Sequence, residues 1–526
     1  MVDQSKSLPY PILVLVQLGI PVLALIIATR IVTIFATGEY DIDMDHEMYF
    51  GQRLLHGELI WTREFHDKLP FVQLAFAIPA AFESIQAWRI LSLSSVVSAA
   101  ILMVALLPRM LKIKSVSRAE LRSVAMFTAL SYVSLSTVLP GDLTHINPMA
   151  GAFALCATLL MLWQGQAHGS SIWLVFLAGL MAAAAISIRP YLLAPIALIG
   201  ILASFLPILG PLQRSFMGGV KLLIGFGAAT LIFGVILNLV PLYVIAGQMP
   251  AFWAGLSMMG QDLNPTEFWG YLFLSFRHGD PVSLGLLFVL ISGTLVFFIG
   301  VLRGTEAAPF AIVQLLAIIC LLVFIAQRHW WPHYISFFVG YFYLFMFGLI
   351  IWTAERRNRF YGLNMVVLCS GLGSLVGLAA SSAALSAGSL IANPAKFAFQ
   401  PGPIVETFRA YREKSPTPIM PFLAPGQMAL HWIFHEPRHG FPHAVNTSQI
   451  NRGWWAFVVP NDVFATPFSA AEYCKFLNEQ SPPFLVVETP VSPTLPCLRE
   501  IGSPYTLDAA LPVAGQPGGL LVFRRM

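Results

Sequence analysis

The residues best suited to chemistry are acids concentrated between Glu39 and Pro70, a stretch that directly follows the first long apolar segment. Only 11% of the chain is charged, yet this stretch holds Glu39, Asp41, Asp43, Asp45, Glu47, Glu58, Glu64 and Asp67. Carboxylates beside a membrane span are costly to desolvate, so they are expected where they line a polar, water-accessible site. We therefore place the candidate site in this loop.

The acids of this loop suit two kinds of chemistry. One carboxylate could act as the general base on an attacking hydroxyl, or the cluster could hold a divalent cation. In an extended segment, the alternating Asp41, Asp43 and Asp45 would share one face. In a helix that begins near Asp45, that residue would be the N-cap and Tyr49 would lie one turn further on. The structural alternative is an interfacial helix whose acidic flank is simply solvated.

Basic residues on the same predicted side of the membrane could hold a phosphate. Lys68 ends the acidic loop in HDKLP, and Arg189 lies in SIRPY between two apolar segments. Arg328 and His333 lie in QRHWWPHY at the outer end of another segment. An Arg between spans with no acid nearby in sequence is costly unless it meets an anion, and a lipid-linked phosphate is an anion available at that depth. Lys68 could instead extend to the membrane interface as a structural residue.

Composition indicates a polytopic helical membrane protein. Of 526 residues, 57% are hydrophobic, and the mean hydropathy is +0.73, which is more apolar surface than one soluble core could use. The net charge is only +4 and the basic residues are dispersed, which argues against a nucleic-acid partner. The five cysteines show no metal-binding spacing, and Cys474 and Cys497 could pair only in an oxidising compartment.

Apolar blocks of about 20 residues predict about eleven transmembrane helices. They span residues 12–36, 86–107, 121–139, 148–163, 172–188, 191–206, 218–246, 281–302, 309–326, 332–353 and 361–387. The apolar piece at residues 71–82 is too short to cross and is predicted to be a re-entrant or interfacial helix.

The distribution of Lys and Arg orients these helices. Short cytoplasmic loops carry the basic excess, and basic clusters lie at residues 109–122, 214–221 and 356–359. Placing these clusters inside puts the N-terminus in the cytoplasm and the acidic loop, residues 37–85, outside. The C-terminal segment then shares the outer, periplasmic face.

Two domains are predicted. Residues 1–390 form an all-α polytopic membrane domain, and residues 391–526, which contain no further long apolar block, form a small soluble α/β domain. Within the second domain, residues 403–414 predict an amphipathic helix, and residues 483–488 and 519–524 predict short strands.

The first loop resembles that of the GT-C superfamily of glycosyltransferases, the group that contains protein O-mannosyltransferases and the lipid A aminoarabinose transferase. In that group an Asp is followed four residues later by Tyr, then by a leucine-containing stretch ending in Gly and by a Lys-x-Pro element. Here these elements are Asp45, Tyr49, residues 54–57 and residues 68–70. The short helix after Pro70, the THINPM loop, SIRPY and the late PHY also follow the order of the family, so the resemblance covers about residues 10–390.

The resemblance implies transfer of a single sugar from a polyprenyl-phosphate donor to an acceptor on the outer face, usually with inversion. It implies a GT-C fold, residence in the bacterial inner membrane as a multi-pass protein, and a glycan, a lipid or a protein as acceptor. Carried over by position, Asp45 matches the catalytic base and Lys68 matches the residue that contacts the lipid phosphate. Arg328 and His333 match a phosphate-binding region of the family.

Two positions depart from the family pattern. His46 follows Asp45 where many relatives have Glu, and Asn147 stands in INPM where relatives often have a second Asp. Asp142 and His145 are the candidates to replace that second acid.

The predicted site therefore has three parts. The candidates for the base are Asp45, Asp43 and Asp41; the donor-phosphate ligands are Lys68, Arg189, Arg328 and His333; and the further substrate contacts are Tyr49, His46, Glu47, Asp142, His145 and Asn147. No metal ligand is assigned, and a divalent cation at the acidic loop stays open as a cofactor.

Two other classes of membrane protein are weighed against this hypothesis. An O-antigen ligase or polymerase would use a pyrophosphate-linked oligosaccharide and place its key Arg and His in a large late outer loop. Residues 248–280 offer Arg277 and His278 but few acids. A sugar or lipid transporter would carry charges midway through its spans and often repeated halves, whereas here the polar residues concentrate at the outer ends of the spans. The glycosyltransferase hypothesis accounts for more of these features.

Overall fold

A computed structural model of the chain describes most of the predicted membrane part and pieces of the C-terminal part. The described residues are 8–36, 42–57, 69–110, 116–138, 143, 145–166, 171–205, 215–241, 243, 336–355, 361–392, 403–415, 422–423, 430, 433–434, 457–459, 462–464, 478, 481–488, 503–513 and 519–526. The chain divides into two compact units. The first contains residues 1–35, 89–235 and 263–396, and the second contains residues 36–88, 236–262 and 397–526.

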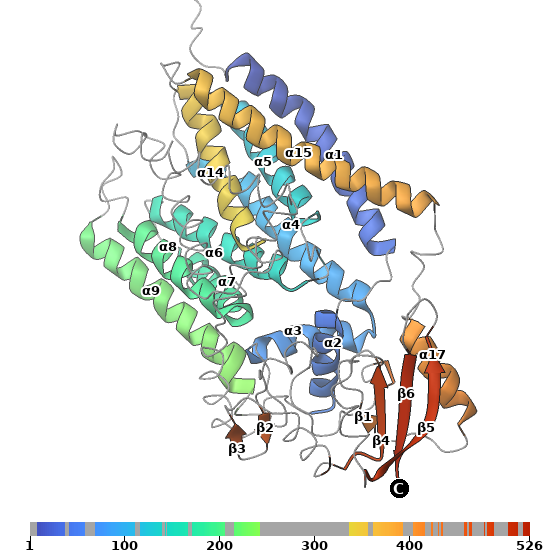
Figure 1. The fold of residues 1–526 in the computed structure, drawn as a ribbon. Helices are drawn as coiled ribbons and strands as arrows, with labels where there is room; N and C mark the ends of the chain where they lie inside the picture. The colour runs from blue at the N-terminus through green and yellow to red at the C-terminus, as the bar shows by residue number, and fades with distance from the viewer. Residues whose placement is uncertain are drawn as a thin grey trace, which may run out of the picture. The chain divides into compact units, whose positions relative to one another are not determined.

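The first unit is helical (Figure 1). Its helices are α1 (Tyr10–Ala36), α4 (Ile85–Met110, which begins in the second unit), α5 (Arg118–Ser136), α6 (Asn147–Gln166), α7 (Ile172–Ile188), the 3₁₀ turn η2 (Pro190–Leu192), α8 (Leu193–Phe205), α9 (Phe216–Gly234), α14 (Ser336–Glu355) and α15 (Tyr361–Ala392). Each begins within a few residues of the start of a predicted apolar block, but α9 ends at Gly234 and its continuation η4 (Val235–Leu239) ends at Leu239, before the end of the block predicted at residues 218–246. Long apolar blocks fold as helices because a membrane leaves no other way to satisfy the backbone hydrogen bonds of a single segment.

Four helices among the described residues are long and apolar enough to cross a membrane: α1, α4, α6, and α9 with its continuation to Leu239. Shorter apolar helices span residues 70–81, 172–188, 190–205, 339–351 and 379–392. The predicted spans 281–302 and 309–326 lie outside the described residues, so the total of about eleven crossings stays a prediction.

Helix α6 lies at the centre of the first unit and is buried over nearly its whole length. It packs against α7, α8 and α14, and α7 packs in turn against α9. Small residues allow close approach: a Cβ at Gly151 of α6 would lie 2.6 Å from the carbonyl oxygen of Ser336, where α14 begins. The start of α14 is thereby held against the start of α6.

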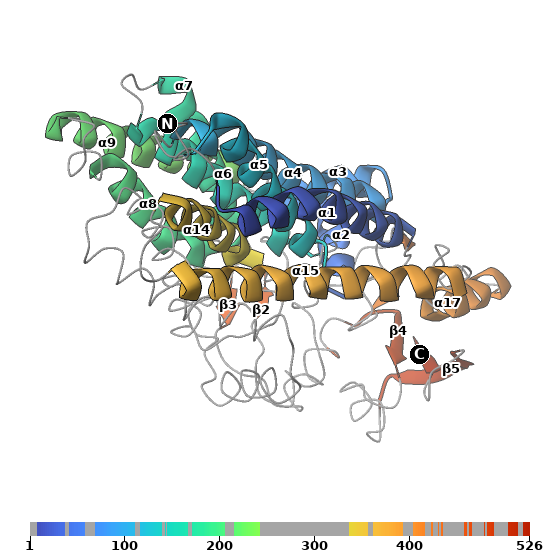
Figure 2. The same ribbon diagram turned by 90° about the horizontal axis from the view of Figure 1, so that it is seen from above.

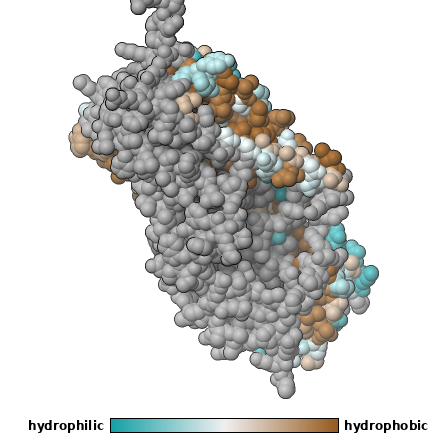
Figure 3. All heavy atoms as spheres, turned by 45° about the horizontal axis from the view of Figure 1, so that its top comes forward, coloured by the Kyte–Doolittle hydropathy of each residue, from teal (hydrophilic) through white to brown (hydrophobic). Residues whose placement is uncertain are grey.

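Helices α1 and α15 lie side by side in two perpendicular views (Figures 1 and 2), with Ile26 against Ala379 and Ala383. Large apolar side chains on these helices are exposed, among them Leu18, Leu25 and Leu385. Apolar residues also cover much of the described surface in the space-filling view (Figure 3). Such a surface is suited to contact with lipid and not with water.

The second unit contains two short helices, α2 (Ile42–Leu55) and α3 (Pro70–Ala81), which pack against each other. It also contains the last four residues of η4 (Val235–Leu239), a π-helical turn that extends α9. Helix α3 begins with Pro at its first position, where the missing N–H has no partner to lose. Its bounds agree with the short interfacial helix predicted from the sequence.

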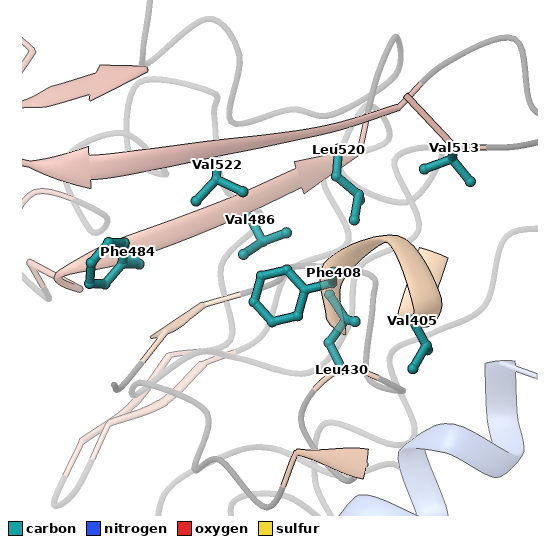
Figure 4. Close-up of a cluster of buried hydrophobic side chains, with 8 residues drawn as sticks. All are labelled: Val405, Phe408, Leu430, Phe484, Val486, Val513, Leu520 and Val522. Atoms are coloured by element: carbon teal, nitrogen blue, oxygen red, sulfur yellow. The ribbon is translucent and has the colours of Figure 1, made fainter. Parts of the chain in front are cut away.

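The C-terminal part of the second unit is a helix on a sheet. Strands β1 (Phe422–Leu423), β4 (Phe484–Glu488), β6 (Gly519–Arg525) and β5 (Tyr505–Pro512) lie in the order β1-β4-β6-β5. The β1–β4 pair is parallel, whereas β4–β6 and β5–β6 are antiparallel, and β2 (Phe457–Val459) pairs separately with β3 (Asp462–Phe464) in an antiparallel arrangement. Helix α17 (Pro403–Lys414) covers the sheet through Val405 and Phe408, which pack on Val486 and Val522 (Figure 4). The helix and the two strands predicted from the sequence are present.

Candidate functional site

Helix α2 carries the acids of the first loop, and it is buried although it is polar. Every described residue from Met44 to Arg53 is buried. The buried polar side chains include Asp45, 9% exposed, and Glu47, 2% exposed, with Gln52 and Arg53 further along. Charged side chains are almost never buried without a partner or a functional reason. The alternative of a helix with a solvated acidic flank is therefore wrong for the described part of α2.

The position of Asp45 in this helix differs from the prediction. Helix α2 begins at Ile42, so Asp45 lies in its first turn and is not the N-cap. The segment is helical from Ile42 and therefore not extended, so the alternating spacing does not place its acids on one face. Acids are favoured at the positive N-terminal end of the helix dipole, which explains why α2 begins before Asp43 and Asp45.

One stripe of α2 combines a carboxylate, a phenol and an amide. Asp45, Tyr49 and Gln52 are spaced i, i+4 and i+7, which places them on the same side of the helix. Tyr49 is 2% exposed and Gln52 is 4% exposed. These three groups can accept or donate hydrogen bonds to a hydroxylated substrate.

Close contact with α3 fixes the orientation of that stripe. A Cβ at Gly51 would lie 2.3 Å from the carbonyl oxygen of Phe76, so only Gly allows the two helices to approach this closely. The side-chain amide of Gln73 donates to the carbonyl oxygen of Phe50 at 2.9 Å. The hydrogen bond is buried, and it ties the backbone of α2 to α3.

Helix α3 is held in turn at its start and at its middle. The backbone N–H of Phe71, in its first turn, donates to Oδ1 of Asn238 in η4 at 3.1 Å. At the middle of the helix, Phe76 stacks on Trp88 with ring centroids 3.8 Å apart. The helix that bears Asp45 therefore rests on a supported neighbour, as a precise site requires.

A second polar cluster lies in the first unit, around Arg189. This residue ends α7 and is 7% exposed. Its Nε donates to Oδ1 of Asn147, the first residue of α6, at 2.8 Å. The backbone N–H of Asn147 donates to Nδ1 of His145 at 3.3 Å. Three predicted site residues separated by up to 44 positions are thus brought together.

The start of α14 lies beside this cluster. Tyr191, two residues after Arg189, meets Phe337 edge-on with ring centroids 5.7 Å apart. Ser336, which begins α14, is buried. It is the described residue nearest in sequence to His333.

The structure does not describe all of the remaining predicted site residues. Asp41, Lys68, Asp142, Arg328 and His333 lie outside the described residues, while Asp43 and His46 lie in α2 with side chains outside the description. Within the described part of the chain, no group of three His, Cys, Asp or Glu side chains could hold a metal ion. Asp45, Glu47 and Tyr49 belong to the second unit, and the Arg189 cluster belongs to the first.

Sequence reasoning missed several buried polar residues of the second unit. Gln52 could have been found, because it continues the helical spacing of Asp45 and Tyr49. Gln73 and Asn238 could not, because their partners are distant in sequence and nothing local marks them. Arg53 is 8% exposed, but it lies where the sequence pattern is typical of an amphipathic helix, in which a charged residue is expected to face water.

No family model and no curated protein sequence matches the chain. Among solved structures, ArnT from Cupriavidus metallidurans in the apo state is similar with a TM-score of 0.54 and 13% identity, covering 95% of this chain and 97% of ArnT. The same protein bound to undecaprenyl phosphate gives a TM-score of 0.55 with the same identity and coverage. The oligosaccharyltransferase of Archaeoglobus fulgidus, in a complex with Zn and sulfate, gives a TM-score of 0.47 at 11% identity and covers 89% of this chain and 68% of its own. The chain is therefore a membrane protein with the fold of ArnT, and the GT-C fold predicted from its first loop is confirmed.

Proposed function

We propose that this protein is an integral-membrane glycosyltransferase that moves a single sugar from a polyprenyl-phosphate donor to an acceptor hydroxyl on the periplasmic face of the inner membrane, with inversion. The observation that carries the proposal is the burial of the acid-bearing helix α2 in a chain with the fold of ArnT. ArnT has been solved with undecaprenyl phosphate, a lipid of the proposed donor class.

The reaction needs a base but no strong acid. The acceptor oxygen attacks the anomeric carbon of the sugar, and the bond from that carbon to the phosphate oxygen breaks. The departing group is a phosphate monoester, which cations can stabilise without protonating it. Asp45 takes the proton of the acceptor hydroxyl, and Asp43 and Asp41 are the alternatives for this role. A divalent cation at the acidic loop could accompany these residues, and the reaction as written does not require one.

The donor phosphate is assigned to basic residues. Lys68, Arg189, Arg328 and His333 are proposed to hold it. The burial of Arg189 supports its assignment as a phosphate ligand, because a buried guanidinium is suited to bind a lipid phosphate that is also desolvated. Tyr49, His46, Glu47, Asp142, His145 and Asn147 are proposed to contact the sugar or the acceptor.

Inversion places the two halves of the site on opposite sides of the sugar. The attacking hydroxyl approaches the anomeric carbon from the side away from the phosphate, so the base and the cations cannot lie on the same side. The acceptor is a glycan, a lipid or a protein. The N-terminus is placed in the cytoplasm and residues 391–526 in the periplasm, so the predicted C-terminal α/β domain shares the side of the acidic loop.

Native mass spectrometry of protein extracted with its own membrane lipids tests the donor. The wild type and Asp45→Asn are expected to retain a polyprenyl phosphate that bears one sugar, whereas Lys68→Ala is expected to lose it. A bound pyrophosphate-linked oligosaccharide would refute the proposal in favour of a ligase. Full retention of the lipid by Lys68→Ala would show that Lys68 does not hold the donor phosphate.

A further inference from the structure

Helix α3 has two faces, and the exposed one is apolar. Its only polar side chain, Gln73, lies on the buried face and donates to the carbonyl oxygen of Phe50 in α2. Ile78 is 47% exposed although it is a large apolar residue, and Phe82, the C-cap, is 71% exposed. Gln73 and Ile78 are five positions apart, about 140° around a helix axis, so the exposed face lies on the side away from α2. The exposed and half-buried residues that share it are Phe71, Leu74, Ala77 and Ala81.

This arrangement is the reverse of what a water-facing surface favours. A helix beside water turns its polar side chains outward and its apolar side chains inward, whereas α3 turns Gln73 inward and Ile78 outward. Helices that lie on a membrane usually carry Lys or Arg on a polar face of their own. Helix α3 contains no charged residue, and the polar helix α2 packs on its other side. The two helices are therefore amphipathic as a pair.

The connection to α4 places α3 beside the membrane. Helix α4 is long and apolar enough to cross a membrane, and only residues 82–84 separate it from α3. A link of this length spans at most about 14 Å. Since the distribution of Lys and Arg orients this end of α4 outward, α3 is expected at the outer boundary of the bilayer.

Local contacts hold α3 against the start of α4. Glu83 has a left-handed backbone, with a φ of 48°, which is uncommon for a residue with a side chain. The N–H of Ser84 donates to the carbonyl oxygen of Pro79 at 3.1 Å, so α3 ends in a sharp turn of the Schellman type. In the first turn of α4, Trp88 stacks on Phe76 of α3. The direction of α3 relative to the start of α4 is therefore fixed.

We propose that the exposed face of α3 lies in the acyl chains of the outer leaflet and that α3 thereby holds α2 at the depth of the lipid headgroups. The axes of packed helices are about 8–10 Å apart, and each headgroup region is about 5–7 Å thick. Helix α2 is thus level with the phosphate of a polyprenyl lipid. The lipid contact does not depend on the proposed function, whereas this consequence for α2 rests on it.

Fluorine NMR of the full-length protein tests the lipid contact. Trifluoromethyl-phenylalanine replaces Phe82, a nearly isosteric change, in nanodiscs of phosphatidylethanolamine and phosphatidylglycerol. A lipid with a doxyl radical on its acyl chain is expected to broaden this signal more than a water-soluble gadolinium chelate does. The same label at Leu507 is the matched control, because Leu507 is also apolar and 55% exposed but lies in β5 of the C-terminal sheet. Its signal is expected to show the reverse order.

Two results would overturn the lipid contact. If the gadolinium chelate broadens the Phe82 signal as strongly as the Leu507 signal, the exposed face of α3 lies in water. If neither reagent broadens the Phe82 signal, another protein surface, such as a second copy of the chain, covers that face.

Ile78→Asp tests the consequence for α2. A carboxylate favours water over acyl chains, so α3 is expected to move outward with α2. Transfer from the polyprenyl lipids of the protein's own membranes is expected to fall by about tenfold or more, because small displacements at a site are that costly. The variant is expected to melt like the wild type in detergent, since the side chain is exposed. Ile78→Leu, which keeps the face apolar, and Leu507→Asp are expected to transfer normally.

The outcomes separate this inference from the proposed function. Full transfer by Ile78→Asp would show that α3 does not set the depth of α2, even where the Phe82 label reports lipid. Absence of transfer in the wild type would refute the proposed function and leave the lipid contact standing.

Discussion

At the scale of single residues, two arginines of the first unit, Arg30 and Arg89, are held by backbone carbonyl oxygens of other helices. Arg30, inside α1, donates from Nε and Nη2 to the carbonyl oxygen of Thr137 at 2.9 and 2.7 Å. Arg89 similarly donates from Nη1 to the carbonyl oxygen of Ile34 at 2.9 Å. Both cations meet carbonyl oxygens at or near the C-terminal ends of helices, where the helix dipole favours positive charge. Both arginines therefore have a structural role.

Tyr411 gives a pH prediction at this scale. It is partly exposed, and its hydroxyl donates to Oδ2 of Asp508, whose Oδ1 lies 3.4 Å from Nη2 of Arg524. Burial, followed by the hydrogen bond and the charge of Asp508, raises the pKa of Tyr411 to about 12. An unfolded Tyr titrates at about 10, so the unfolded chain loses this proton first. The share of stability due to Tyr411 is therefore complete below about pH 10 and lost as the pH rises to about 12.

Ultraviolet titration of the phenolate checks this prediction. The difference between the wild type and Tyr411→Phe is expected to have its midpoint near pH 12. Tyr505→Phe is a suitable comparison, because burial also raises the pKa of Tyr505 to about 12. A midpoint for Tyr411 near the ordinary value of about 10 would contradict the described contact with Asp508.

At the scale of elements, the packing of α2 on α3 depends on Gly51. Gly51→Ala would place a methyl group 2.3 Å from the backbone oxygen of Phe76, and backbone cannot move aside cheaply. The substitution is expected to lower the free energy of unfolding by about 1–3 kcal/mol and to reduce transfer activity, because the α2 stripe shifts. Thermal unfolding and the transfer rate check both effects.

Gly227→Ala in α9 is the control for this prediction. Gly227 is exposed, and a Cβ there meets nothing within 4 Å. It is expected to leave unfolding and activity unchanged. Equal behaviour of the two alanine variants would show that α2 and α3 are not as close as described.

The hydrogen bond between η4 and α3 gives a second prediction for elements. Asn238→Leu removes the acceptor for the Phe71 N–H and is expected to destabilise the protein by about 0.5–1.5 kcal/mol. Asn238→Asp keeps an acceptor and places a negative charge at the N-terminus of α3, so it is expected to preserve stability. Thermal unfolding of the two variants distinguishes these outcomes, and equal losses would show that the hydrogen bond does not stabilise α3.

Most elements could be predicted from the sequence, and most contacts within the site could not. Helix α7 has the predicted bounds of residues 172–188, because a block so apolar has clear ends. The start of α2 was misplaced, since Asp is favoured both as N-cap and in the first turn. The bond between Asn147 and Arg189 joins two helices and leaves no local pattern in the sequence.

At the scale of the whole molecule, the topology predicts which surfaces face the periplasm. Exposed Lys414 in α17 is placed outside, and exposed Ala119 at the start of α5 is placed in the cytoplasm. A membrane-impermeant maleimide, added to cells with a permeabilised outer membrane, is therefore expected to label Lys414→Cys. Ala119→Cys is expected to react only after lysis of the inner membrane. The reverse labelling pattern would show that the protein has the opposite orientation in the membrane and would refute a periplasmic site.

In the proposed reaction one sugar is transferred, and the leaving group is a polyprenyl monophosphate. The most direct measurement incubates the purified protein with lipids and acceptors from its own membranes and follows polyprenyl lipids by mass spectrometry. The wild type is expected to convert polyprenyl-phosphate sugar into polyprenyl phosphate, and Asp45→Asn is expected to do so more slowly by a factor of about 10²–10⁴. Release of polyprenyl pyrophosphate, or an unchanged rate in Asp45→Asn, would contradict this account.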